Sequence, residues 1–276
     1  MPPVRTIKQN SSTAKSGILS APGFVGKPDK DEAVASSTVK LESPAPSVTE
    51  PSKKNPSRPV VQGVKDARFD SSKRDWDEKY YQLIGTSTRK IFFGIEFKLT
   101  DNHINDILSL GNRVCEKLWA FIFEYVDVDH DSNNDAMSLT DEAVVRLARA
   151  CPNLRTVRIP GTYHLADDSL LAFFEFCPKL TLVELTRNVH NFVGQAKVSG
   201  RSLEKLRENP EWGPKLKKLS VPDGDAQFLK TVRALTKERE WMTVTVVHSS
   251  YGKKWGSEYI NNMSEDYRKG RKQFKF

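Results

Sequence analysis

The three cysteines of this chain stand at the same position of a repeated sequence, and thiols aligned by a repeat could bind a metal or carry out redox chemistry. The sequence reads C-x-x-L, with copies at Cys115, Cys151 and Cys177, and a fourth copy has Gly213 in place of cysteine. No histidine lies at ligand spacing beside them, and an odd number of cysteines is not typical of a disulfide framework. We therefore expect thiols packed as small apolar side chains, with no metal and no other cofactor.

A second candidate for metal binding is the acidic segment 127–135, whose alternate residues mimic the ligand spacing of an EF-hand loop. These residues are Asp127, Asp129, Asp131, Asn133 and Asp135. However, Ser132 stands where the loop needs glycine, and Ser138 stands where it needs the closing glutamate. The flanks also read as strand and loop, where an EF-hand has two helices. We therefore favour an acidic, solvent-exposed loop.

Catalytic chemistry has no comparable signal. The sequence contains no nucleophile elbow, phosphate-binding loop, dinucleotide fingerprint or zinc-protease motif. Its histidines show no pairing with a nucleophile or a metal-ligand set; they are His103, His130, His164, His190 and His248. We therefore expect a protein that is not an enzyme.

We call each copy of C-x-x-L, including the copy with glycine, the cysteine phrase. Its leucine is the first residue of an apolar ladder of the form L-x-x-Φ-x-Φ, where Φ is a large apolar residue. The clear ladders are Leu118, Phe121, Phe123; Leu154, Val157, Ile159; Leu180, Val183, Leu185; and Leu216, Leu219, Val221. Fainter ladders flank them at Phe92, Ile95, Phe97 and at Trp241, Val244, Val246. A repeat of this length indicates a solenoid.

The residues before each cysteine phrase predict a helix. Leu99-Thr100-Asp101, Leu139-Thr140-Asp141 and Leu165-Ala166-Asp167 each precede apolar residues three, six and seven positions after the Asp, which mark one helix face. Thr and Asp suit the N-cap and the positive end of the helix dipole. The unit is thus a capped helix, a turn and a short strand, and stacked copies must share one core.

The phrase L-T-D … C-P-x-L-x-x-L-x-L resembles the cysteine-containing subtype of leucine-rich repeats, found in F-box substrate receptors and ribonuclease-inhibitor-like domains. The resemblance covers about residues 88 to 250, and the repeats that end at Cys151 and Cys177 match well. It implies an α/β fold: a short right-handed solenoid with about six parallel strands on its concave face and helices outside. No F-box is recognised.

Composition divides the chain into three regions. Residues 1–75 are rich in Ser, Pro and Lys and lack apolar periodicity, so we expect a disordered tail. Residues 76–250 would form the repeat domain, beginning with an N-terminal cap. Residues 251–276 are basic, and Tyr259, Ile260, Met263 and Tyr267 have helix-like spacing, which predicts a short helix that covers the last repeat.

The formal net charge of +8 raises the question of nucleic-acid binding. Residues 76–249 hold 23 basic and 24 acidic residues, so the excess belongs to the two tails. The basic cluster 268–272 is either a solubilising terminus or a weak nuclear localisation or nucleic-acid signal. The acid-free first 28 residues resemble a mitochondrial transit peptide in charge, but their prolines disfavour one. No apolar run suits a signal peptide or membrane span, so we expect a protein of the cytoplasm, the nucleus or both.

What remains is a binding surface, and the ladder register predicts its residues. If the ladder residues face the core, their neighbours face the concave side. Those we assign to protein binding are Glu96, Lys98, Ile122, Glu124, Thr156, Arg158, Leu182, Glu184, Lys218 and Ser220. Glu96, Ile122, Arg158, Glu184 and Ser220 should form one row, in which Arg158 and Glu184 either contact a partner or only pair with each other.

Two functions remain open. The first is a protein interaction scaffold or substrate-recognition adaptor that uses the concave face, with a link to ubiquitin ligation implied by the resemblance. The alternative is a nuclear or RNA-associated protein whose basic tails bind nucleic acid while the solenoid positions them. In either case we expect no membrane partner.

Overall fold

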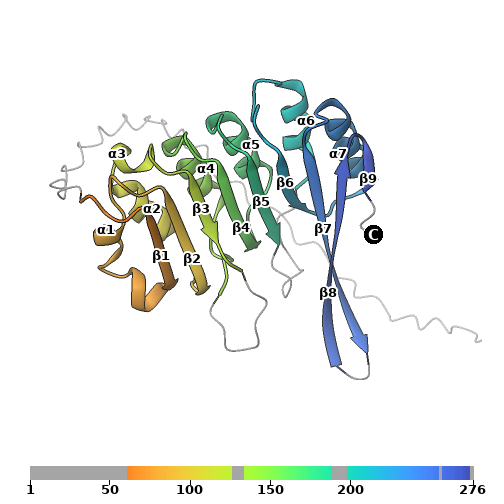
Figure 1. The fold of residues 1–276 in the computed structure, drawn as a ribbon. Coiled ribbons are helices and arrows are strands. Elements are labelled where there is room, and N and C mark those ends of the chain that lie inside the picture. The colour runs from red at the N-terminus through yellow and green to blue at the C-terminus, as the bar shows by residue number, and fades with distance from the viewer. Residues whose placement is uncertain (1–60, 126–133, 188–197, 255–256, 274–276) are drawn as a thin grey trace, which may run out of the picture. The chain divides into compact units, whose positions relative to one another are not determined.

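The chain folds around one nine-stranded sheet whose strands follow one another in sequence order (Figure 1). The computed structural model describes residues 61–125, 134–187, 198–254 and 257–273, with the backbone alone for 249–262. Strands β1 to β7 pair in parallel, whereas β8 and β9 continue the sheet antiparallel. The strands are β1 (Asp66–Ser71), β2 (Lys90–Glu96), β3 (Ala120–Phe123), β4 (Thr156–Thr162), β5 (Leu182–Arg187), β6 (Lys218–Pro222), β7 (Thr243–Lys254), β8 (Ser257–Arg268) and β9 (Arg271–Gln273).

Helices connect the parallel strands and lie behind the sheet in Figure 1. They are the short π-helix η1 (Ser72–Trp76), α1 (Tyr80–Leu83), α2 (Asp101–Ser109), α3 (Asn112–Cys115), α4 (Asp141–Ala150), α5 (Asp167–Phe176), α6 (Arg201–Glu208) and α7 (Ala226–Glu238). Their apolar faces share one core with alternate strand residues. We call the opposite side of the sheet the open face. No helix in the described part of the chain is both long enough and apolar enough to cross a bilayer.

The α/β architecture with helices beside a parallel sheet was predictable, but the sheet is longer than the six strands expected. Strand β1 lies inside the segment predicted to be disordered, so the folded part begins before residue 76. Ala67, Phe69 and Ser71 alternate inward, and Phe69 packs edge-on to Trp76 at a centroid distance of 4.8 Å. This strand carries no cysteine phrase, and its side chains are buried against β2 and η1, so local composition could not reveal it. Residues 1–60 lie outside the described part.

The predicted C-terminal helix is wrong, because residues 257–268 form β8, which pairs antiparallel with β7. Of the residues with helix-like spacing, Tyr267 is buried opposite Val244, whereas Met263 is 55% exposed. The last parallel strand would otherwise present unpaired backbone groups, and a hairpin satisfies them directly. The chain therefore covers this end of the sheet with a strand.

The first ladder also differs from the prediction, by four residues, because Ile91 and Phe93 pair with Phe121 and Phe123 of the next ladder. Ile91 and Phe93 are buried, whereas Phe92 is half-buried on the open face and Ile95 is 48% exposed. Thr88 occupies the position of the first ladder leucine and is fully buried. Its hydroxyl donates to the Val64 carbonyl at 2.7 Å and accepts from the Gly85 amide at 2.9 Å. A polar residue in the leucine position hid this repeat from an apolar pattern.

The last ladder is one residue shorter than the others. Met242 is fully buried and its amide donates to the Arg239 carbonyl, as the Leu216 amide donates to that of Gly213. Trp241, which the sequence placed in the core, is instead 52% exposed. The deletion moves the tryptophan from the core to the rim of the sheet.

Carboxylates at the helix N-termini join each repeat to the next. Asp101, the first residue of α2, accepts hydrogen bonds at 2.8 Å from both the amide and the hydroxyl of Thr140, the N-cap of α4. Asp141, the first residue of α4, accepts from the Ala166 amide at 3.0 Å and from the amide and hydroxyl of Ser169. These aspartates therefore link successive helices, beyond the dipole role that the sequence suggests.

Asp167 repeats this arrangement between α5 and α6 and is the most buried of the three, at 8% exposed. It accepts from the amides and hydroxyls of Ser199 and Ser202 at 2.6 to 3.0 Å. Burial acts to raise the pKa of Asp167, but these four hydrogen bonds outweigh burial and lower it below its ordinary value. The folded state thus favours the charged carboxylate. We call Asp101, Asp141 and Asp167 the aspartate ladder.

We predict that Asp167→Asn lowers the free energy of unfolding at pH 7 by about 2 kcal/mol, because an amide cannot accept four hydrogen bonds. Urea denaturation measures this loss. Since the folded-state pKa is lowered, the carboxylate stabilises the fold above about pH 4 and loses this effect as pH falls through the folded pKa. The variant and the wild type should therefore converge in acid. Asp168→Asn, at the exposed neighbouring residue, should cost less than about 0.5 kcal/mol; equal losses would contradict the prediction.

Candidate binding face

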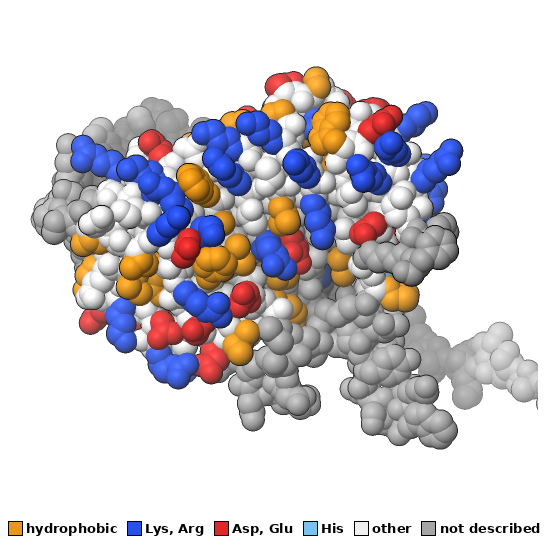
Figure 2. Space-filling model, viewed as in Figure 1, with side chains coloured by type: hydrophobic (Ala, Val, Ile, Leu, Met, Phe, Trp, Pro, Cys, Tyr) orange, Lys and Arg blue, Asp and Glu red, His pale blue; other side chains and the backbone are white. Residues whose placement is uncertain are grey.

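The open face carries a central row of side chains across the parallel strands (Figure 2). The pairing register sets Phe92 beside Ile122, Ile122 beside Arg158, Arg158 beside Glu184, and Glu184 beside Ser220. Four of the five residues of the predicted row thus lie next to one another. The fifth, Glu96, does not.

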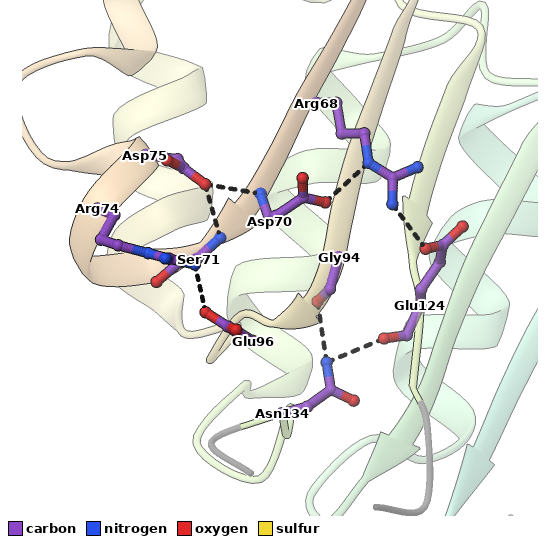
Figure 3. Close-up of polar contacts among 9 residues, drawn as sticks. All are labelled: Arg68, Asp70, Ser71, Arg74, Asp75, Gly94, Glu96, Glu124 and Asn134. Carbon is purple, nitrogen blue, oxygen red and sulfur yellow. Dashed lines mark hydrogen bonds and ion pairs between the residues drawn. The ribbon is translucent and has the colours of Figure 1, made fainter.

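Phe92 occupies the place predicted for Glu96, because the first ladder begins four residues earlier than the sequence pattern indicated. Glu96 pairs instead with Ser71 of β1, at the carboxyl end of β2, and its carboxylate forms an ion pair with Arg74 of η1 (Figure 3). The row therefore begins with an aromatic side chain beside an aliphatic one, not with an acid.

Glu124 and Lys98 also lie at the carboxyl ends of the strands. The Glu124 carboxylate lies 3.4 Å from the Arg68 guanidinium, which donates to Asp70 at 2.7 Å (Figure 3). Lys98 forms an ion pair with Asp135 at 3.6 Å, at the end of the acidic segment 127–135, most of which lies outside the described residues. Both predicted residues thus belong to intramolecular charge pairs.

An asparagine that the sequence did not single out organises this end of the sheet. The side-chain amide of Asn134 donates to the carbonyls of Gly94 at 3.0 Å and Glu124 at 2.9 Å (Figure 3). It is buried, at 5% exposed, so it bridges β2 and the end of β3. No apolar or repeat pattern includes this position, and only the fold reveals its role.

The remaining predicted residues form a second row at the amino ends of the strands. Thr156 pairs with Leu182, and Leu182 pairs with Lys218. Ala120 continues this row on β3. Lys218 is exposed, and Thr156 and Leu182 are half-buried. Their geometry suits contact with a partner more than any chemical step.

The Arg158 guanidinium donates to the Glu184 carboxylate at 2.7 Å, so the lateral pair considered from the sequence is formed. The two side chains are 46% and 24% exposed, and such a pair contributes about 0 to 1 kcal/mol to stability. Ser220 beside them is only 6% exposed. The centre of the face is therefore a charged pair adjoining the apolar pair Phe92 and Ile122.

All three cysteines are buried and free. The Cys177 thiol lies 3.6 Å from the carbonyl oxygens of Ala148 and Cys151, and burial raises its pKa to about 12. The hydrogen bond between Cys115 and Cys151 lowers the pKa of Cys115, and this bond together with burial raises the pKa of Cys151. The thiols stack between repeats beside the helix ends, in contact with backbone carbonyls.

We predict that Cys177 resists alkylation by iodoacetamide at pH 8 in the folded protein, since a pKa of about 12 leaves roughly one thiolate in ten thousand. Peptide mass spectrometry can follow each cysteine separately. Labelling should appear only when urea unfolds the chain. Rapid labelling of Cys177 under native conditions would contradict its burial.

In the last repeat, Arg239 takes the position that cysteine holds in three earlier copies and Gly213 holds in the fourth, after the end of α7. It is 5% exposed, and its guanidinium donates to the carbonyls of Leu206, Asn209, Trp212 and Gly213 at 2.5 to 3.4 Å. Burial lowers its pKa. The arginine thus satisfies carbonyls in the last turn of α6 and in the segment that follows it.

We predict that Arg239→Met lowers the free energy of unfolding by about 3 kcal/mol, because it leaves buried carbonyls without a donor. Chemical denaturation measures the change. Arg233→Met is the matched control, since Arg233 is exposed on the same helix and its guanidinium carbon lies 5.9 Å from the centroid of the Tyr267 ring. The free energy of unfolding lost by Arg233→Met should stay below about 1 kcal/mol. If both variants lose the same amount, the contacts of Arg239 with the carbonyls do not stabilise the last repeat.

Within the described ranges, no cluster of three or more His, Cys, Asp or Glu side chains could hold a metal ion. His103 belongs to the capping box of α2, where its Nδ1 accepts from the Thr100 amide at 3.0 Å, and burial lowers its pKa. His164 is exposed, and His130 and His190 lie outside the described residues. A scan against models of known protein families finds no match, and a search of curated proteins finds none either.

Proposed function

We propose that this protein is a non-enzymatic binding scaffold, a leucine-rich repeat solenoid of the cysteine-containing kind, that holds a partner protein on its open face. The observation that carries the proposal is the central row, where the apolar pair Phe92 and Ile122 adjoins the ion pair of Arg158 and Glu184. Mixed apolar and charged contacts of this kind are typical of protein interfaces.

The arrangement of the repeats supports the solenoid assignment. Strand, turn and helix recur in order, and each strand pairs with the strand of the next repeat. The aspartate ladder links α2 to α4, α4 to α5 and α5 to α6. The cysteines lie at equivalent helix ends. Nearest-neighbour contacts of this type are what hold the stacked repeats of a solenoid together along their shared core.

The resemblance to F-box receptors extends the proposal to substrate recognition in ubiquitin ligation. Because no F-box is recognised, docking to a ligase would require another chain, and the open face would supply only the recognition step. The compartment remains the cytoplasm, the nucleus or both. The alternative, nucleic-acid binding by the basic tails, concerns mostly residues outside the described part and stays a prediction.

The test exchanges charges on the open face without removing the ion pair. Arg158→Glu with Glu184→Arg keeps a salt bridge but inverts the pattern that a partner would meet. We expect full-length bait carrying this swap to lose a discrete captured protein by tenfold or more relative to wild type, measured by quantitative mass spectrometry. Ile122→Lys should lose the same protein, because it places a charge in the apolar half of the row.

The matched control is Arg201→Glu with Asp168→Arg, which inverts an exposed ion pair on the helix side of the fold. It should retain the captured protein. Circular dichroism melts should show that all variants fold. If both swaps capture the same set of proteins as wild type, the open face is not the binding surface and the proposal fails.

A further inference from the structure

The residues that immediately precede the strands form a continuous row along one edge of the sheet. The Trp119 amide donates to the Arg89 carbonyl at 2.7 Å, the Arg155 amide to that of Trp119 at 2.7 Å, the Thr181 amide to that of Arg155 at 2.8 Å, and the Lys217 amide to that of Thr181 at 2.9 Å. The basic rim is our name for this row together with the exposed lysines beside it. Its residues are Arg89, Trp119, Arg155, Thr181 and Lys217 of the row, and Lys117, Lys179, Lys215 and Lys218 beside it. Its members come from separate repeats, and the sheet sets their spacing.

Further cations adjoin the row on both sides. Lys117, Lys179 and Lys215 occupy equivalent positions two residues after the repeat cysteine or glycine, and Lys218 follows Lys217 at the start of β6. All four are exposed. Figure 2 shows blue side chains gathered over the amino ends of the strands, in the upper part of the view. The repeat therefore multiplies positive charge along one edge.

The charge of the basic rim is only slightly compensated. Asp66 forms an ion pair with Lys90 at 3.7 Å, but among the described residues no ion pair involves Arg155, Lys215 or Lys217. Acidic side chains lie instead at the carboxyl ends of the strands, with Glu96 and Glu124 (Figure 3). The near-neutral total of residues 76–249 thus includes a local excess of cations at the amino ends of the strands, whereas the acids at the carboxyl ends pair with Arg68, Arg74 and Lys98.

An aromatic platform lies within the basic rim. Trp119 is 38% exposed, and the guanidinium carbons of Arg155 and Arg89 lie 4.6 and 5.8 Å from its ring centroid. The Arg89 guanidinium is held by hydrogen bonds to the carbonyls of Thr86 and Thr88. Trp241 is a second exposed indole, in the repeat position that Lys215 holds in the preceding copy. Planar groups are therefore exposed among the cations.

We propose that the basic rim binds single-stranded nucleic acid, with phosphates on the lysines and bases stacked on Trp119 and its flanking guanidinium groups. Cations that track a backbone, together with aromatic side chains for unpaired bases, are what such sites combine. A row across five strands spaced about 4.8 Å apart spans roughly 20 Å, enough for several nucleotides. Paired bases in a duplex could not reach the indole, which favours a single strand.

The experiment measures fluorescence anisotropy of a labelled 20-nucleotide oligouridine titrated with the full chain at several salt concentrations. Lys215→Gln with Lys217→Gln should weaken binding about tenfold and reduce the slope of log K against log salt by about 1.4, since two phosphate contacts are lost. Trp119→Ala should weaken binding at least fivefold and leave that slope unchanged, because stacking releases no counterions.

The matched control is Lys73→Gln with Lys230→Gln, which removes two exposed lysines from η1 and α7 and should bind like wild type. Polyglutamate and vesicles rich in phosphatidylserine serve as competitors. Unchanged binding by the Lys215 and Lys217 variant would assign any affinity to the tails and overturn the proposal. Equal competition by either polyanion, or no effect of Trp119→Ala, would show general capture of negative charge and overturn the assignment to nucleic acid. The outcome is independent of the open-face test.

Discussion

The rest of this structure depends on one interaction: the aspartate that begins a helix accepts hydrogen bonds from residues at the start of the helix in the next repeat. Parallel strands fix the spacing of the repeats at one side of the fold, but the helices need their own connection. The aspartate ladder supplies it, because each carboxylate belongs to one repeat and its donors belong to the following one. A buried carboxylate is costly unless it is fully hydrogen-bonded. The requirement for donors therefore fixes how successive helices align.

Much of the repeat region could be predicted because its pattern is local. The ladders from Leu118 to Val221 are buried as expected, and the alternation of side chains along strands correctly placed Ile122, Arg158, Glu184 and Ser220 in one row. The register in which neighbouring strands pair follows from the sequence alone when each repeat carries the same cysteine phrase.

The errors arose where a repeat lost its usual residues. A buried hydroxyl at Thr88 replaced a leucine, a deletion moved Trp241 outward, and β1 and β8 lack the cysteine phrase altogether. Each of these elements is determined by a partner distant in the sequence. The basic rim was missed for a related reason, since summing charge over a region cannot show on which edge of a sheet the charges lie.

The reversal of direction at β8 has a consequence for how far such an array can extend. A parallel repeat can always accept another copy of itself, so a solenoid with two similar ends tends to grow by end-to-end association. Here one end runs antiparallel and finishes in β9, a strand of only three residues that are all exposed and include Arg271 and Lys272. Short, charged edges oppose strand addition. The hairpin thus acts as a stop that fixes the length of the sheet within the molecule.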